Sequence, residues 1–593
     1  MLPPNSALAQ KDTISAWKEE ILNTINADEM SAASYEQLLE MLDELELRNS
    51  DTMRHKPIKQ DIMLKTDFCL NRREGYRAIT TEKIAKNKAY LGNATNQTIR
   101  YRMQVNDVWD VGFTLNKDAG EAMRKRVPFY DSYSVFALYK ARSRKTLQSL
   151  AIGDFRVKMA SGLLINQQFT MGKSNAATTF LQGGNTFTKH SSAQEYNYMQ
   201  GVAAALRFGR FVAEPFLSYR QLDAVVKQDT ITSIPTDGYH RTKNEAGKRH
   251  NTAVLNSGAH VAYRGDWYEL GANVLYTRFA HEFSQPLRKY NGNYFRGKEL
   301  IQWSADYYAR RFGFVLRGET AFDSKLNIAT LTQLSHPLGE DWNCDFTFRR
   351  YSSHYQQLYA SALAEGSCMQ GETGAMLRVE GSPLPYFSCS IMADYFHFTT
   401  VHYGFDAPVR GFDIRAQAQY NRTRYNISAT YRMLNKHDIK HNLDLTATYS
   451  PVGGLMFKTQ LRQRIFSSRE EGGYSFGQAL VQAIGWNKDT SPLRAEAQCA
   501  WFNTPNYNTR IYISEKNVLY SASFPMLYGK GMRYTFVGSC RILQNLVFEM
   551  KYSLLHYFDR DKISSGLQQI TGNSQHNLWL QMRIKLPFSA KKS

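Results

Sequence analysis

The residue alternation near the C-terminus constrains the fold more than any other feature of the chain. The stretch HNLWLQMRIKLPF, residues 576–588, has an apolar side chain at every second position from Leu578 to Phe588, with Trp, Gln, Arg and Lys between them. Successive side chains of a β-strand point to opposite faces, so this rhythm predicts a strand with one apolar face. The medium that covers this face then decides the class of protein.

The same alternation recurs along the chain from about residue 60. Clear examples are TIRYRMQV (98–105), GFDIRAQAQY (411–420), RYNISATYRM (424–433) and HNLDLTATY (441–449). In each, one row is apolar and the other carries Arg, Gln, Asn or Thr. About 24 such segments fit between residues 62 and 588, and most approach the roughly 10 residues of a membrane-spanning strand.

The links between these segments differ in length in a regular way. Short links fall at 106–107, 209–210, 265–266, 313, 421–423, 450–454 and 544–545, whereas long ones run roughly over 72–96, 158–195, 223–253, 280–298, 352–372, 503–531 and 558–575. Short turns at one end and long loops at the other are typical of outer-membrane barrels. An even strand count requires that residues 518–528 belong to an external loop and not to the wall.

The fold class that we predict is an antiparallel, all-β transmembrane barrel of about 24 strands (range about 22–26) in the bacterial outer membrane, preceded by a short acidic α-helical segment. No run of about 18 apolar residues is present, which excludes a membrane-spanning helix. Soluble β-sandwiches or a propeller are the alternative. They have shorter strands of about 5–6 residues, and no blade-like repeat is visible.

The N-terminal region differs from the rest. Ala7-Leu8-Ala9 has the small-x-small pattern of a signal-peptidase site, so we interpret residues 1–9 as the remnant of a signal peptide. Residues 10–58 have helical spacing, a capping box at Ser34 and Gln37, and nine acidic residues against one basic residue between Lys18 and Glu46. We expect this segment to be periplasmic and residues 59–593 to form the barrel with its long external loops.

The chain has 73 basic and 53 acidic residues, a net charge of +20 that favours a polyanionic neighbour. Many basic residues fall on the polar rows that we expect to face the lumen. Two interpretations remain open: a cationic passage that favours anions, or a lumen held by Arg–carboxylate ladders that needs no substrate. The basic residues predicted to face the lumen are Arg100, Arg102, Arg415, Arg424, Arg432, Lys458, Arg462, Arg464, Arg533, Arg541, Arg583 and Lys585.

A barrel of about 24 strands is wide enough to leak unless something closes it. The candidates are the long loops 158–195, 223–253 and 503–531 folded inward, or the acidic helices drawn into the basic lumen. The preferred inward loop is 510–534. Its candidate residues are Arg510, Tyr512, Tyr520, Tyr528 and Lys530.

Motifs for catalysis or cofactor binding are weak. MGKS (171–174) lacks the upstream glycine of a phosphate loop, and no Ser or Asp nucleophile can be paired with a His by spacing. The six cysteines form no CxxC pair or metal-ligand spacing. We therefore predict no catalytic residues, no metal and no cofactor.

Several stretches resemble a family of Bacteroidota outer-membrane barrels named helix-hairpin-helix domain-containing proteins. Matching pieces run in order along the barrel, among them FTLNKDAGEAM (113–123), IGDFRVKMASGLLI (152–165), GYHRTKNE (238–245), YQQLYASALAEGS (355–367) and RIYISEKNVLYSASFPMLYGKGMRY (510–534). The family name implies a DNA-related transport role. The hairpin unit is missing here, because LELRNSDTMRHKPIKQ leads directly into the first strand. We therefore assign DNA binding to no residue of this chain.

These features together favour a plugged or gated outer-membrane channel or translocation component, with a cationic lumen for anionic or polymeric cargo. One alternative is a non-conducting scaffold whose acidic helices recruit a periplasmic protein, and another is a membrane-embedded hydrolase. The expected partners are outer-membrane lipid and lipopolysaccharide, with nucleic acid implied by the resemblance alone.

Overall fold

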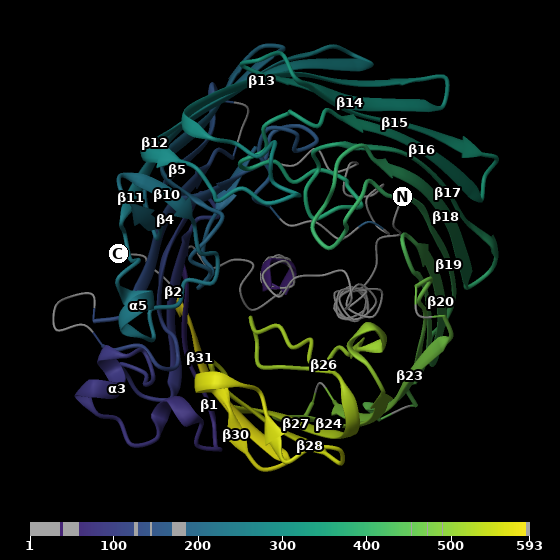
Figure 1. Cartoon of the computed structure of the whole chain (residues 1–593). Helices are drawn as coiled ribbons and strands as arrows, with labels where there is room; N and C mark the ends of the chain where they lie inside the picture. Colours follow the sequence, from purple (N-terminus) through teal and green to yellow (C-terminus); the bar gives the residue numbers. More distant parts are fainter. Residues whose placement is uncertain are drawn as a thin grey trace, which may run out of the picture.

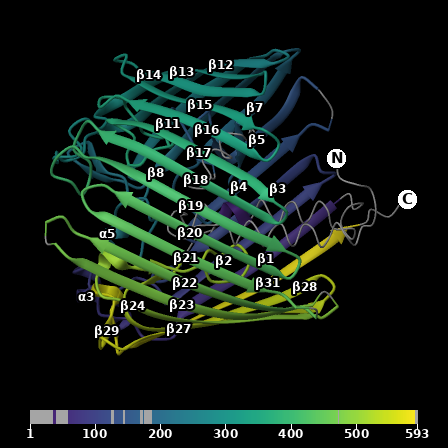
Figure 2. The same cartoon turned by 90° about the vertical axis from the view of Figure 1, so that its right-hand side faces the viewer.

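The structure, a computed structural model, describes residues 36–39, 58–123, 129–142, 145–168, 173, 186–451, 453–470, 472–488 and 490–588. Within them, 24 antiparallel strands form one closed barrel (Figure 1; Figure 2). The last strand closes the ring because it pairs with the first along Ile58–Cys69 and with its predecessor on the other side. The predicted antiparallel barrel of about 24 strands is confirmed.

The wall contains long strands joined mostly to their neighbours in sequence. Its strands are β1 (Ile58–Cys69), β2 (Thr95–Val105), β3 (Trp109–Lys117), β4 (Ser132–Lys140), β5 (Leu147–Val157), β7 (Met199–Phe208), β8 (Phe211–Leu222), β11 (Thr252–Arg264), β12 (Tyr268–Phe283), β13 (Gly297–Arg311), β14 (Phe314–Asp323), β15 (Ile328–Leu338), β16 (Trp342–Tyr351), β17 (Glu372–Leu384), β18 (Phe387–Phe398), β19 (Arg410–Arg422), β20 (Tyr425–Asn435), β21 (Ile439–Tyr449), β22 (Leu455–Ser467), β23 (Tyr474–Asn487), β24 (Leu493–Thr504), β27 (Gly529–Leu543), β28 (Leu546–Tyr557) and β31 (Ser574–Phe588).

The remaining elements are short and lie in the connections. They are β6 (Phe187–Lys189), β9 (Val225–Lys227), β10 (Thr230–Ser233), β25 (Ile511–Tyr512), β26 (Met526–Leu527), β29 (Lys562–Ile563), β30 (Ile570–Thr571), the helices α3 (Thr81–Ala85) and α5 (Lys243–Ala246), and the 3-10 turns η1 (Glu74–Tyr76), η2 (Tyr507–Thr509) and η3 (Gly566–Gln568). The β25–β26 hairpin pairs only with itself, so residues 518–528 are outside the wall, as predicted. Among the described helices, none has the length and apolar character to cross a membrane.

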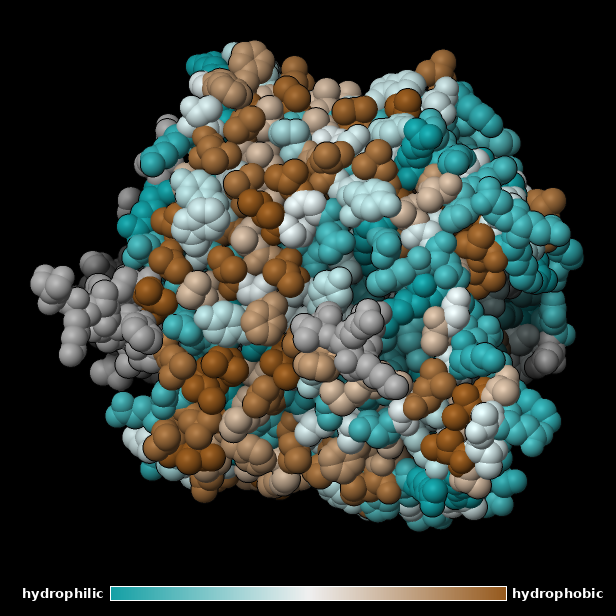
Figure 3. Space-filling view, turned by 90° about the vertical axis from the view of Figure 1, so that its left-hand side faces the viewer, coloured by the Kyte–Doolittle hydropathy of each residue, from teal (hydrophilic) through white to brown (hydrophobic). Residues whose placement is uncertain are grey.

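The two-residue rhythm separates the two faces of the wall. On β22, Leu455, Phe457 and Leu461 are 40%, 41% and 43% exposed, whereas Arg462 and Arg464 of the other row are buried inside the ring. Large apolar side chains cover much of the outer surface in the same way (Figure 3). A closed barrel with an apolar outer belt is the architecture of bacterial outer-membrane proteins, and this chain is one of them.

The N-terminal predictions fall mostly outside the described residues, which begin at 36 and omit 40–57. Only the helical residues 36–39 of the acidic segment are described. Leu39 is buried in a small apolar cluster with Met63 of β1 and with Leu519 and Tyr520 of an external loop. This purple turn lies within the ring in Figure 1.

The lipid-facing assignment predicts a depth-dependent cost of charge. Leu461 lies at the middle of β22 and Leu455 is its first residue. We expect Leu461→Arg to lower the free energy of unfolding in lipid by about 2–4 kcal/mol and Leu455→Arg by at most about 1 kcal/mol. Reversible denaturant titration in vesicles measures both. Equal costs for the two variants would contradict a lipid-facing middle of this strand.

Candidate functional site in the barrel lumen

Two external loops fold into the lumen and pack on each other. Residues 158–168 and 352–371, called here the inner loop pair, are joined by hydrogen bonds from the Asn166 amide to the Tyr359 carbonyl (3.0 Å) and from the Ser361 amide to the Gly162 carbonyl (3.1 Å). Leu163 and Tyr355 are fully buried in the apolar core that surrounds the pair. The loop 158–195 was one of several candidate inward loops in the sequence, whereas the inward fold of 352–371 was not predicted.

Carboxylates of the wall hold the inner loop pair through its backbone. The Glu319 side chain on β14 accepts hydrogen bonds from the Ser161 amide (2.9 Å) and the Leu163 amide (3.1 Å). Glu372 at the start of β17 accepts from the amides of Glu365 (2.9 and 3.0 Å) and Gly366 (3.0 Å). Both carboxylates are fully buried. Because unpaired amides inside a barrel are costly, these two acids fix where the loops enter the lumen.

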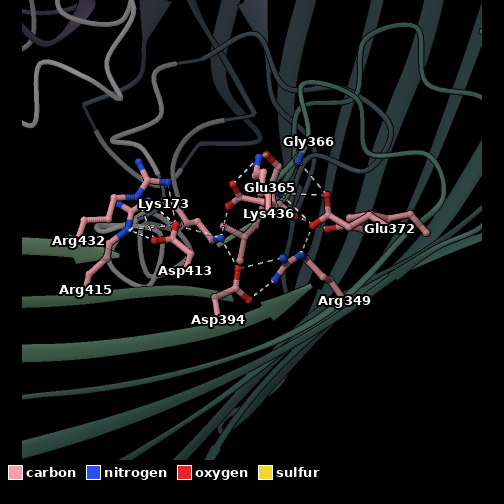
Figure 4. Close-up of polar contacts among 12 residues, drawn as sticks. Lys173, Arg349, Glu365, Gly366, Glu372, Asp394, Asp413, Arg415, Arg432 and Lys436 are labelled. Atoms are coloured by element: carbon pink, nitrogen blue, oxygen red, sulfur yellow. Dashed lines mark hydrogen bonds and ion pairs between the residues drawn. The ribbon is translucent and has the colours of Figure 1, made fainter. Parts of the chain in front are cut away.

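An ionic cluster joins the same loops to the wall (Figure 4). Arg349 on β16 donates to both oxygens of Asp394 on β18 (2.8 and 3.0 Å) and to Glu372 (2.6 Å), and its side chain is fully buried. Lys173 lies between Asp394, Glu365 and Asp413, with its ammonium nitrogen 3.5 Å from Asp413.

The cluster continues along the wall to β19 and β20. Arg415 and Arg432 lie 2.8 Å and 2.9 Å from Asp413, and Lys436 lies 2.7 Å from Glu365. Five cations thus face four carboxylates. Burial alone would raise the pKa of the Glu365 carboxyl, but Lys173 and Lys436 outweigh it and hold that pKa below its usual value.

A third loop enters the lumen from the opposite side. Residues 505–528 place Glu515, which is fully buried, against Arg533 of β27 and 3.1 Å from the ammonium of Lys551 on β28. Further along the loop, the Tyr520 hydroxyl accepts a hydrogen bond from Arg583 (3.2 Å), and the Arg100 guanidinium stacks on the Tyr520 ring at 4.3 Å. This loop therefore reaches the strands where the barrel closes.

Most of the basic residues predicted to face the lumen lie on inward rows, and many have carboxylate partners. Arg102 lies 2.6 Å from Asp110, Arg464 lies 2.7 Å from Asp444, and Arg583 also contacts Asp61. Two placements differ from the prediction. Arg424 is exposed in the turn between β19 and β20, because β20 begins only at the next residue. Arg541 lies on the inward row but is exposed at the short-turn end of β27.

The residues of the predicted inward loop are divided between two environments. Tyr520 is buried in the lumen as described, and the Tyr512 carbonyl accepts a hydrogen bond from Arg462 (3.0 Å). Arg510 stacks on Tyr507, and Tyr528 stacks on Arg560, nearer the loop end of the barrel. The prediction that Lys530 belongs to the inward loop is wrong, because Lys530 is an exposed residue of β27 on the row opposite to the buried Arg533.

The external loops contain a second charged cluster that spacing did not reveal. The ring nitrogens of His240 lie 2.6 Å from Asp131 and 3.0 Å from Asp223, and its backbone amide donates to Glu121 (2.8 Å). Donor atoms of Glu121, Asp131 and His240, and of Glu195, Asp223 and His240, lie close enough to hold a cation. Both nitrogens of His240 already bind carboxylates, so the arrangement is that of a buried ion pair.

Comparisons with known proteins find solved structures of transporters, receptors and a porin at low sequence identity. No protein-family model and no curated protein matches the chain. Among solved structures, the copper transporter OprC is 9% identical with a TM-score of 0.43, covering 90% of this chain and 83% of that chain. The siderophore receptor PirA from Acinetobacter baumannii is 7% identical with a TM-score of 0.44, at 90% and 81% coverage. The anion-selective porin from Comamonas acidovorans is 11% identical with a TM-score of 0.27, at 57% and 100% coverage.

The His240 cluster predicts a pH dependence of the external loops. Burial opposes the charged ring, but hydrogen bonds to Asp131 and Asp223 raise the pKa of His240 from 6.5 to about 10. Its contribution to stability is therefore complete below pH 6.5 and is lost as the pH rises through 10. Burial and the neighbouring carboxylates raise the pKa of Glu195 from 4.5 to about 9, so its ionisation also destabilises the cluster as the pH rises.

We expect proteolysis within residues 238–250 to be faster at pH 10 than at pH 7, relative to cleavage at the exposed Arg469. His240→Gln should reduce this difference but not abolish it, because Gln does not titrate whereas Glu195 still does. An unchanged pH ratio in that variant would show that the imidazole is not the responsible group.

Proposed function

We propose that this protein is a gated outer-membrane transport channel that is closed here by its own inward loops, with a cationic lumen that favours anionic cargo. The observation that carries the proposal is the way the inner loop pair is attached. Hydrogen bonds join it to the wall at Glu319 and Glu372, and Lys173 links Glu365 of the pair to Asp394 of the wall. No wall strand runs through residues 158–168 or 352–371. The pair can leave the wall with no strand–strand pairing of the barrel broken.

The excess of basic residues supports the choice of cargo. The lumen rows carry Arg and Lys on many strands, and the whole chain has a net charge of +20. In a low-dielectric wall, such rows lower the electrostatic barrier for anions. In the closed state the loop carboxylates Glu365 and Glu515 neutralise Lys436 and Arg533, so the lumen does not carry these two cations unpaired. When the loops move, both cations become available to anionic cargo.

The acidic N-terminal segment contributes a second closure in this proposal. Leu39 packs on Met63 of the inner wall and on Tyr520 of the third loop. This contact holds residues 36–39 inside the ring and favours a closing role over the recruitment of periplasmic partners that a scaffold would need. The segment is acidic and the lumen rows are basic, so electrostatic attraction favours this position.

The hydrolase alternative has less support. The His240 ring is held by two carboxylates, which leaves neither nitrogen to activate a nucleophile. The resemblance to the helix-hairpin-helix family, with its implied DNA-related transport, remains a proposal that conductance experiments with DNA can address.

Conductance across planar bilayers tests the gate at Lys173. Lys173→Met removes the ion pairs that tie this loop residue to Asp394 and Asp413 of the wall, which destabilises the closed state by about 1–3 kcal/mol and raises the open-to-closed ratio roughly 5- to 150-fold. Lys325→Met is the matched control, because Lys325 is exposed in the loop between β14 and β15. The proposal fails if the Lys173 variant conducts no more than this control.

Deletion of residues 10–50 tests the second closure separately. We expect the basal anion current to increase, because the deletion removes Leu39 from its contact with Met63 and Tyr520. Leu39→Asp in the full chain should reproduce part of the increase. An unchanged current in both variants would contradict a closing role of the acidic segment. It would not contradict the gate that the inner loop pair forms.

A further inference from the structure

The barrel wall has an opening near its external end between β4 and β8. The pairing of β4 with β5 begins only at Phe136↔Gly153, and the pairing of β7 with β8 ends at Gly201↔Ser218. Past these two pairs, one edge of β4 (Ser132–Val135) faces one edge of β8 (Tyr219–Leu222). Within the described residues, no strand pairs with either of these edges. β5 and β7 have left the wall at this level, and each strand would occupy about 4.8 Å of its width.

Two glycines allow β5 and β7 to leave the wall at this point. Gly153 and Gly201 are directly paired, with φ of +91° and +156°. A Cβ atom would lie 2.3 Å from the Val135 carbonyl oxygen at Gly153 and 2.1 Å from the Leu217 carbonyl oxygen at Gly201. Only glycine fits at these positions, so β5 and β7 can turn together into the lumen.

Side chains replace part of the missing pairing at the base of the opening. The Asp154 carboxylate accepts hydrogen bonds from the Val135 amide (3.0 Å) and from the Gln200 side chain (3.1 Å), and the Ser218 hydroxyl accepts from the Gln200 amide (3.0 Å). A bare strand edge in contact with lipid tails would be costly. The opening is therefore a polar feature, called here the wall notch.

The wall notch contains a cavity of about 240 Å³ with aromatic and polar lining. On its floor the Tyr198 ring stacks on His190, with centroids 4.2 Å apart, and the Arg220 guanidinium lies 3.7 Å above the Tyr198 ring. Tyr133 and Tyr219 border it from outside, where they are 43% and 62% exposed. Asp131, Glu195 and Asp223 also line it.

The wall notch lies at the edge of the lipid-facing surface of the barrel. On the side of the notch nearer the middle of the membrane, the strands β4, β5, β7 and β8 each have an outward apolar residue that is about half exposed. These residues are Val135, Ile152, Val202 and Leu217. These contact acyl chains, and the notch continues this lipid interface at the level where tyrosines mark the headgroups. On this side of the barrel, hydrophilic side chains gather toward the loop end while apolar ones cover the rest (Figure 3).

We propose that the wall notch binds a sugar ring of outer-leaflet lipopolysaccharide. The tyrosine rings offer flat apolar faces to the C–H side of a sugar, and the carboxylates and Arg220 offer partners for its hydroxyls. Asp131 is paired with Arg249 and His240, and Glu195 stays protonated at neutral pH, so charge does not select the ligand. The exposed rings of Tyr133 and Tyr219 favour a sugar ring, because a phosphatidylglycerol headgroup has no ring to stack on them. The site is independent of the gate, because it does not require the inner loop pair to move.

Native mass spectrometry of the delipidated full-length protein in detergent tests this proposal with lipopolysaccharide and phosphatidylglycerol as probes. The double variant Tyr133→Ala/Tyr219→Ala should bind lipopolysaccharide at least tenfold more weakly than the wild type. The matched control Tyr395→Ala/Tyr431→Ala removes two outward tyrosines that are 39% and 38% exposed on β18 and β20, and it should bind as the wild type does. Equal losses in the two double variants, or equal binding of phosphatidylglycerol by the wild type, would overturn the proposal.

A photo-reactive residue at the exposed Gln221 position provides a second readout in native outer membranes. The expected adduct is lipopolysaccharide. Adducts with a protein would identify the notch as a protein-binding edge instead, and adducts with phospholipid alone would reduce it to ordinary lipid contact. Bilayer currents that stay normal in the Tyr133/Tyr219 variant would separate the failure of this site from the failure of the gate.

Discussion

Buried carboxylates that accept backbone amides are the interaction on which the interior of this barrel depends. A ring of 24 strands is too wide for its own side chains to fill, so external loops enter the lumen and bring polar backbone with them. Each entering amide has to find an acceptor, and Glu319 and Glu372 supply it from the wall. The arginines and Lys173 then neutralise the carboxylates that gather at the same place. The entry of the loops into the lumen and the charge balance there thus arise from one requirement.

The wall was predictable from the sequence because a strand in lipid must satisfy a local rule. Alternation at Leu461 or Phe412 depends only on neighbouring residues, and short and long links give the topology. The prediction that 518–528 lies outside the wall had the same basis. Arg424 and Lys530 were assigned to the wrong places because each lies at a strand end, where a shift of one residue changes its surroundings.

The site itself could be predicted only in part. The basic inward rows were visible, but their acidic partners in the loops were not, because Glu365 and Glu515 lie in segments without periodicity. Contacts such as Asp131 with His240 join residues more than a hundred positions apart, and no local pattern encodes them. The paired glycines Gly153 and Gly201 were a readable signal in retrospect, since glycine inside a strand often marks a bend.

Hydrogen–deuterium exchange of the protein in lipid nanodiscs tests most directly whether wall carboxylates hold the loops in the lumen. The amides of Ser161, Leu163, Glu365 and Gly366 donate to Glu319 or Glu372. We predict that these four amides exchange far more slowly than those of an exposed loop such as 406–407, and that Glu319→Ala, which removes the acceptor, accelerates the first two selectively. Exchange of all four at the rate of the exposed loop would contradict it.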